Sequence, residues 1–236
     1  MSSSYRLLKN MKKEINSQAL MEAGVHYGYS RTRRHPTVSP YIYGNKKGTD
    51  IIDIDKIFPQ IEKASKLLNE LGSSNKVVLF VGVKPEARAQ IINIAQSLNQ
   101  PYVTERWIGG ILTNFSEIKY RIEKLEKMKE ERVNGEYAKY TKKEQLLLNR
   151  EMERLNKYFN GLIGMKRMPD ALVVIDSKKE HIAIKEARRQ NIPVISIGNT
   201  DCSIRAIDYP IIANDSSVSS IEIILDILKN AYQGEK

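Results

Sequence analysis

After residue 50 the chain alternates between short apolar runs and longer segments whose apolar residues recur every three or four positions. Continuous β-branched runs are typical of strands covered on both faces, and the periodic segments are typical of helices. The predicted strands are residues 76–82, 101–105, 170–176, 192–198 and 208–213, with 101–105 the weakest. The predicted helices are residues 55–72, 84–100, 179–191 and 216–233. This order predicts an α/β fold, a parallel sheet with helices on both faces.

The first predicted helix carries its own start and stop signals. Asp55 is the expected N-cap, Pro59 lies early enough to be tolerated, and Gly72 is the expected terminator. The apolar stripe of this helix consists of Ile57, Ile61, Ala64, Leu68 and Leu71. We therefore expect one face of the helix to cover the sheet.

Residues 113–160 have a different pattern, a narrow apolar seam among many charges. Asn134 and Gly135 interrupt the seam, and Thr141 and Glu144 have the spacing of a capping box that opens a second helix. Two helices of similar length joined by a short turn predict an antiparallel, coiled-coil-like hairpin. Its 12 Lys/Arg and 9 Glu nearly balance, so we interpret most of these charges as a solvated face.

The chain is thus predicted to have three parts. Residues 1–50 form a basic N-terminal helix, loop and β-hairpin arm. Residues 51–112 and 161–236 form the α/β/α domain, and residues 113–160 form the inserted helical hairpin.

Net charge narrows the functional classes. The chain carries 38 Lys+Arg against 28 Asp+Glu, a net charge of +10, and residues 1–50 hold nine cations against three acids, so 9 − 3 = 6 of the excess lies there. Such a surplus favours polyanionic partners, above all nucleic acid. An anionic membrane would require a basic amphipathic helix with a wide apolar face, and no secretory signal or membrane-spanning run is present. We expect an intracellular protein that does not bind membranes.

Signals for enzymatic chemistry are weak. The turn at residues 80–89 has neither the spaced glycines of a dinucleotide site nor a P-loop. The scattered histidines and the single cysteine, Cys202, do not make a metal cluster. Asp176, at a strand end, could belong to an acidic pocket with Asp53 or Asp201, but capping the next helix is the commoner role for such a carboxylate. We predict no catalytic residue, no cofactor and no metal.

Residues 23–48 interleave tyrosines with cations in a segment held extended by Pro36 and Pro40. Guanidinium groups bind phosphates bidentately, and aromatic rings stack on exposed bases, so this mixture suits folded RNA. Tyr41 and Tyr43 alternate as in a hairpin strand, and we expect at least one of these rings to pack instead. Trp107, in the glycine-containing bend of residues 107–110, is expected either to pack or to stack.

Six blocks resemble the bacterial-type family of the second small-subunit ribosomal protein. They are LMEAGVHYGYSRTRRHPTVSPYIYG, RWIGGILTNF, MPDALVVID, EHIAIKEA, NIPVISI and IIANDS, in family order over residues 16–232. The resemblance implies a flavodoxin-like (Rossmann-like) α/β/α fold with an inserted helical hairpin, which matches the layout predicted above, and a noncatalytic role in assembly and translation. The family usually has a second histidine where this chain has Tyr29, an asparagine where it has His35, and a lysine where it has Ile163.

Site residues follow from the basic segment and from position in the family blocks. The expected RNA-binding residues are His26, Tyr27, Tyr29, Arg31, Arg33, Arg34, His35, Lys46, Lys47, Arg106, Trp107, Thr113, Asn114, Lys166 and Arg167. The implied partners are 16S-type rRNA and neighbouring small-subunit proteins, including the large mRNA-capturing one, around a monomer. The expected location is a bacterial cytoplasmic ribosome, favoured over an organellar one because no amphipathic leader is present. An α/β enzyme and a free nucleic-acid-binding regulator remain the alternatives.

Overall fold

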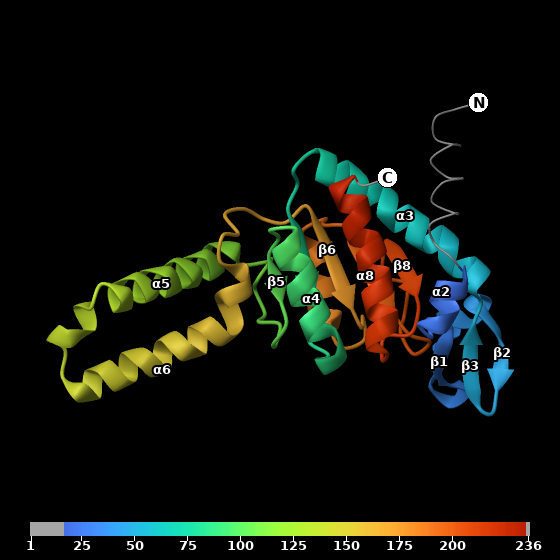
Figure 1. The fold of residues 1–236 in the computed structure, drawn as a ribbon, viewed down its shortest axis with the longest axis horizontal. Helices are drawn as coiled ribbons and strands as arrows, with labels where there is room; N and C mark the ends of the chain where they lie inside the picture. The colour runs from blue at the N-terminus through green and yellow to red at the C-terminus, as the bar shows by residue number, and fades with distance from the viewer. Residues whose placement is uncertain (1–16, 235–236) are drawn as a thin grey trace.

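The computed structural model describes residues 17–234 and has a five-stranded parallel sheet at its centre (Figure 1). The strands are β4 Val78–Val81, β5 Tyr102–Val103, β6 Ala171–Ile175, β7 Val194–Gly198 and β8 Tyr209–Ile212. Their spatial order, β5-β4-β6-β7-β8, is the flavodoxin-like order, with the connection reversing direction between β4 and β6. The predicted fold class is confirmed.

Helices cover both faces of this sheet. On one face lie α3 Ile54–Ser73, α4 Pro85–Ser97 and α8 Val218–Gln233, and on the other lies α7 His181–Arg189. The strands are buried on both sides because alternate residues enter two cores: Val78 and Phe80 join the first, and Leu79 and Val81 join the second. This explains why the strands read as continuous apolar runs.

The ends of α3 differ from the prediction. The N-cap is Asp53, whose carboxylate accepts a hydrogen bond from the backbone N–H of Asp55 at 3.1 Å, and the helix continues past Gly72 to Ser73. Gly72 serves a packing role, because a Cβ atom there would lie 1.8 Å from the carbonyl oxygen of Tyr232 on α8. The glycine therefore permits close contact between two helices and does not end one.

The helical hairpin projects away from the sheet (Figure 1). It consists of α5 Phe115–Val133 and α6 Lys142–Phe159, with short 3₁₀ turns at Glu136–Lys139 and Asn160–Leu162. Gly135 has a φ of +72°, which suits the turn, and the capping box of Thr141 and Glu144 is present. The buried seam continues the second core outward from the sheet.

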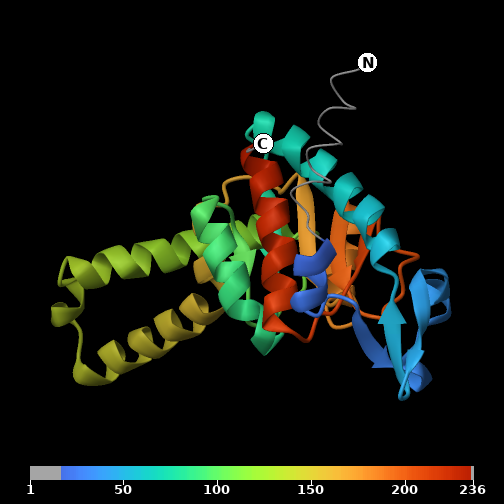
Figure 2. The same ribbon diagram turned by 45° about the vertical axis from the view of Figure 1, so that its right-hand side comes forward.

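The basic N-terminal arm contains a small antiparallel sheet beside the carboxyl end of β8 (Figure 2). Its elements are α2 Ser17–Glu22, β1 Tyr27–Ser30, the 3₁₀ turns Arg31–Arg33 and Pro36–Tyr41, β2 Ile42–Lys46 and β3 Thr49–Ile52, with strand order β1-β3-β2. The predicted hairpin corresponds to β2 and β3, and β1 is a third strand that the sequence pattern did not indicate. The basic helix expected before residue 17 falls outside the described residues.

Candidate nucleic-acid interface

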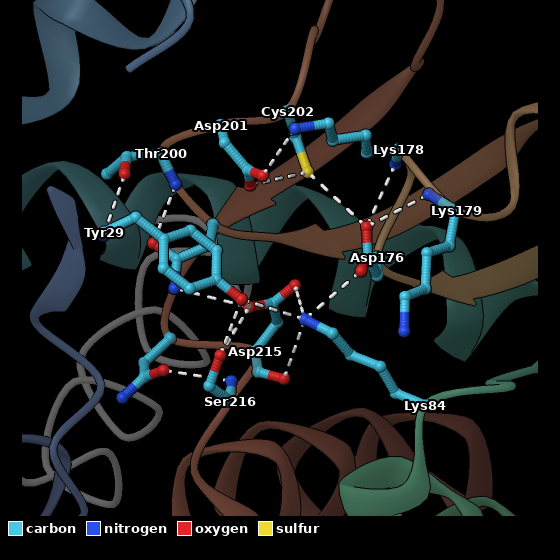
Figure 3. Close-up of polar contacts among 12 residues, drawn as sticks. Tyr29, Lys84, Asp176, Lys178, Lys179, Thr200, Asp201, Cys202, Asp215 and Ser216 are labelled. Carbon is cyan, nitrogen blue, oxygen red and sulfur yellow. Dashed lines mark hydrogen bonds and ion pairs between the residues drawn. The ribbon is translucent and has the colours of Figure 1, made fainter. Parts of the chain in front are cut away.

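A buried ion-pair cluster lies at the carboxyl ends of β4 and β6 (Figure 3). This is where doubly wound sheets usually hold a ligand. The Lys84 ammonium lies 2.7 Å from Oδ2 of Asp215 and 3.2 Å from Oδ2 of Asp176. Lys84 is 8% exposed and Asp215 is fully buried. This buried cation is therefore neutralised from within the protein.

Tyr29 of the arm reaches into the same cluster. Its hydroxyl accepts a hydrogen bond from Lys84 at 3.1 Å, donates one to Asp215 at 3.2 Å and lies 2.7 Å from Oγ of Ser216. The Arg33 guanidinium stacks over the ring of Tyr29, 4.8 Å from its centroid. Tyr29 therefore fastens the arm to the sheet, and its hydroxyl is already occupied.

Electrostatics keep Lys84 charged in this buried position. Burial alone would lower the pKa of Lys84, but the hydrogen bond and charge of Asp215, followed by the charge of Asp176, raise this pKa above its usual value. Asp176 also accepts hydrogen bonds from the backbone N–H groups of Lys178 and Lys179, at 3.1 and 3.2 Å, ahead of α7. Asp176 therefore closes the turn before α7 and does not cap the helix, because the N-cap of α7 is Glu180 and makes no side-chain cap hydrogen bond.

The alternative acidic pocket is not assembled. Asp53 caps α3, and Asp201 forms an ion pair with Lys178 at 3.0 Å. Cys202 is buried, which raises the pKa of its thiol to about 11. Within residues 17–234, no three His, Cys, Asp or Glu side chains are grouped so that they could hold a metal ion, and no helix has the length and apolar character of a membrane span.

The arm docks on the loop that follows β7. Thr200 accepts hydrogen bonds from two arm backbone N–H groups, from Tyr29 to its Oγ1 at 3.0 Å and from His35 to its carbonyl at 2.8 Å. Gly28 sits so close to this loop that a Cβ atom there would be 2.6 Å from Cγ2 of Thr200 and 3.0 Å from the carbonyl oxygen of Asp50. The cationic loop is therefore held rigidly against the α/β domain.

One of the predicted arm cations is paired with a buried carboxylate, whereas four others are exposed. Arg34 forms a bidentate ion pair with the fully buried Asp50, with N–O distances of 2.5 and 2.7 Å. Arg31, Arg33, Lys46 and Lys47 are exposed and form no ion pair with any described residue. Arg34 thus stabilises the arm, whereas the other four can receive phosphates.

The aromatic residues and histidines of the arm divide similarly. Tyr27 and Tyr43 are exposed, whereas the ring of Tyr41 packs against the first core, as expected for one of the pair. The ring of His26 is partly buried, which lowers its pKa, and lies against Tyr27. The Nδ1 atom of His35 accepts a hydrogen bond from the backbone N–H of Thr37. Tyr27 and Tyr43 therefore offer the rings that bases can reach.

A single buried carboxylate shapes the second predicted block, residues 106–114. Glu186 of α7 accepts hydrogen bonds from the indole of Trp107, from the backbone N–H groups of Gly110, Leu112 and Thr113, and from the Thr113 hydroxyl, all at 2.9–3.2 Å. Trp107 is buried, so it packs and does not present a stacking face. Its neighbours Arg106, Thr113 and Asn114 are exposed.

The remaining predicted residues lie elsewhere. Lys166 and Arg167 precede β6, at the amino edge of the sheet, whereas the arm and the loop after β5 meet the carboxyl edge. Both are exposed, and Arg167 forms an ion pair with Asp170 at 3.1 Å. Sequence reasoning did not single out Lys84, Asp215 or Glu186 as site-forming residues. No local signal marks these contacts, because Lys84 and Asp215 are 131 positions apart.

Comparisons with known proteins agree on one family. A family model described as Ribosomal protein S2 matches residues 20–234. The chain is 40% identical to the small ribosomal subunit protein uS2 of Thermus thermophilus over 215 residues, which cover 91% of this chain and 84% of that protein. It is 42% identical to the uS2 of Dictyoglomus turgidum and 40% identical to that of Coprothermobacter proteolyticus, each over 92% of this chain and over 88% and 81% of those proteins.

Proposed function

This chain belongs to the ribosomal protein S2 family, and from that premise we propose that its N-terminal arm binds small-subunit rRNA through the free cations of residues 31–47. Family membership makes the protein a structural component of the small ribosomal subunit in the cytoplasm, and not an enzyme. Its partners are rRNA and other ribosomal proteins. The part that we propose is that the N-terminal segment makes the rRNA contact.

The observation that carries this proposal is that four exposed arm cations lie at two turns without a carboxylate partner among the described residues. Of the twelve hairpin cations, five lie within 4 Å of a glutamate: Lys119, Arg121, Lys124, Lys127 and Lys139. In the arm, Arg31, Arg33, Lys46 and Lys47 have no such partner among the described residues. A cation without a carboxylate partner breaks no ion pair when it binds phosphate, so these four arm cations suit RNA.

The arrangement also suits phosphate better than a small anion. Arg31 and Arg33 occupy one exposed 3₁₀ turn, whereas Lys46 ends β2 and Lys47 lies in the turn between β2 and β3. Docking through Gly28 and Thr200 fixes these two turns on one rigid arm, so little entropy is lost when they are ordered on RNA. The exposed rings of Tyr27 and Tyr43 provide stacking surfaces for unpaired bases.

The test is the salt dependence of binding to a 16S-type rRNA transcript. The variant Arg31→Ala with Arg33→Ala should flatten the plot of log K against log salt by about one unit for each phosphate that the arm no longer binds. The matched control is Arg121→Ala with Lys124→Ala, which removes the same charge from paired positions. A slope equal to that of the unmodified protein in the arm variant would refute the proposal.

Two finer assignments belong to the same proposal. We place Arg106, Thr113 and Asn114 at the RNA surface as a second contact, and Lys166 with Arg167 as a peripheral one. On the family resemblance we also propose a contact with the large mRNA-capturing ribosomal protein. Reconstituted subunits with and without this chain should differ in the occupancy of that protein, and equal occupancy would remove this neighbour.

A further inference from the structure

In α7 and the turn before it, the acidic side chains are buried and the basic side chains are exposed. All three acids of residues 176–190, Asp176, Glu180 and Glu186, are buried. Every cation of the same stretch is exposed: Lys178, Lys179, Lys185, Arg188 and Arg189. A solvated helix usually mixes both signs on its outer face, so this separation presents solvent with positive charge alone.

The outer cations of α7 have few internal partners. Lys178 is bound to Asp201. The side chains of Lys179, Lys185, Arg188 and Arg189 form no ion pair or hydrogen bond with the described part of the chain. The positions 185, 188 and 189 are three and four residues apart, so they share one side of the helix. This contrasts with α5, where the glutamates lie beside the cations.

The inner face of α7 is fixed to the proposed RNA-binding parts. Glu186 holds the loop of residues 110–113, and Asp176, just before the helix, holds Lys84 and through it Tyr29 of the arm. Asp201 raises the pKa of Lys178, and the nearby charge of Arg33 opposes this shift. The arm turn that carries Arg33 therefore lies near the start of α7.

We propose that the outer face of α7 together with the turn before it, defined by Lys179, Lys185, Arg188 and Arg189, is a second phosphate-backbone contact for structured RNA. A membrane surface does not fit, because Ile182 is the one large apolar residue exposed on this helix. Cations in a last helical turn also stabilise the helix dipole, which accounts for Arg188 and Arg189 but not for Lys179. This inference rests on the proposed rRNA binding of the chain.

The test compares two triple variants of the full chain, again with a 16S-type rRNA transcript. In the first, Lys185, Arg188 and Arg189 are changed to Gln, which keeps the aliphatic stems and the helix propensity. In the control, Lys56, Lys66 and Lys76 are changed to Gln. Each control lysine is ion-paired, with Asp53, Glu62 and Asp170 respectively, and none lies on α7. Both variants remove three charges, so a general effect of net charge is the same in both.

The α7 variant should flatten the plot of log K against log salt by up to about three units, and the control should flatten it by clearly less. The melting temperatures of both variants should be near that of the unmodified protein. A second α7 variant, Lys179→Gln with Lys185→Gln, leaves the last turn intact and should flatten the slope by about two units. If both α7 variants keep the slope while Arg31→Ala with Arg33→Ala flattens it, α7 is not a contact and the arm proposal stands. If only the α7 variants flatten it, the second contact stands and the arm proposal fails.

A competition experiment distinguishes RNA from an acidic protein as the partner of this surface. Poly-L-glutamate serves as the competing polyanion without phosphate. If the α7 variant loses affinity for poly-L-glutamate but binds rRNA with an unchanged slope, the surface is a protein contact and the inference is overturned.

Discussion

The carboxylate of Glu186 lies 3.1 Å from the indole nitrogen of Trp107, 79 positions away in the chain, and accepts its hydrogen bond. The same carboxylate holds three backbone N–H groups of the following loop. Burial alone would raise the pKa of Glu186, but the hydrogen bonds from Gly110, Trp107 and the other donors lower it. One side chain of α7 thereby determines the shape of the loop that leads into the helical hairpin.

Glu186→Gln should destabilise this loop. A glutamine amide turns two donor hydrogens toward groups that are themselves donors, so buried N–H groups lose their partner at a cost of about 2–4 kcal/mol. Trp107 is the only tryptophan, and its fluorescence reports the change directly. Urea unfolding should show a lower midpoint and a red-shifted native emission. The control is the exposed Glu222→Gln, and equal behaviour of the two variants would contradict the role of Glu186.

Lys84→Met should be strongly destabilising. It leaves Asp176 and Asp215 buried without a counter-charge, which costs about 3–5 kcal/mol in comparable sites. Urea unfolding should show this loss, and adding Asp215→Asn to the variant should recover part of it because one buried charge is removed. A double variant no more stable than Lys84→Met alone would show that the ammonium is not needed to neutralise Asp215.

Gly28→Ala should release the arm without unfolding the sheet domain. The added Cβ would lie 2.6 Å from Thr200 and 3.0 Å from a backbone oxygen, so the arm backbone must move. We expect rRNA affinity to fall by about tenfold or more, equivalent to about 1.4 kcal/mol, while a cooperative melt persists. Gly44→Ala is the control, because a Cβ there meets nothing within 4 Å. An undiminished affinity in Gly28→Ala would separate arm docking from RNA binding.

Glu180 should make the free energy of unfolding depend on pH between 4.5 and about 7. Burial, followed by the nearby charge of Asp176, raises the pKa of Glu180 to about 7 from a reference value of 4.5. The folded state then binds more protons than the unfolded state between these two values, so stability falls as pH rises from 4.5 to 7. The difference amounts to at most about 3 kcal/mol. Glu180→Gln should flatten this part of the stability curve in urea titrations, and an unchanged curve would argue against a raised pKa.

Shortening the hairpin should leave the α/β sheet folded. Lys124 and Glu151 face each other across the hairpin at 2.5 Å. Joining residues 124 and 151 by a short glycine-rich turn therefore removes the distal part without stretching the proximal part. Circular dichroism should show a cooperative melt for the shortened chain. Loss of that cooperative transition would mean that the hairpin and the sheet fold as one unit and not as separate parts.

The local sequence pattern alone determined most of the elements. Val78 to Val81 are apolar at every position because both faces of β4 are covered, and this pattern identifies a strand without knowledge of its neighbours. The capping box of Thr141 and Glu144 spans three positions, so it too is visible in the sequence. The cationic surplus of the arm indicated RNA, and the family blocks indicated the ribosome. Both signals are likewise visible in the sequence alone.

Contacts between distant residues were decided only by the tertiary structure. The sequence assigned Arg34 and Trp107 to RNA along with their neighbours, yet Arg34 is paired with the buried Asp50 and Trp107 with Glu186. The sequence predicted Gly72 as a helix end. Its actual constraint is close contact with the α8 backbone, 160 positions later, which the local pattern does not reveal. Composition reveals how many charges a segment carries, but a buried partner from another element decides which of them remain free to bind.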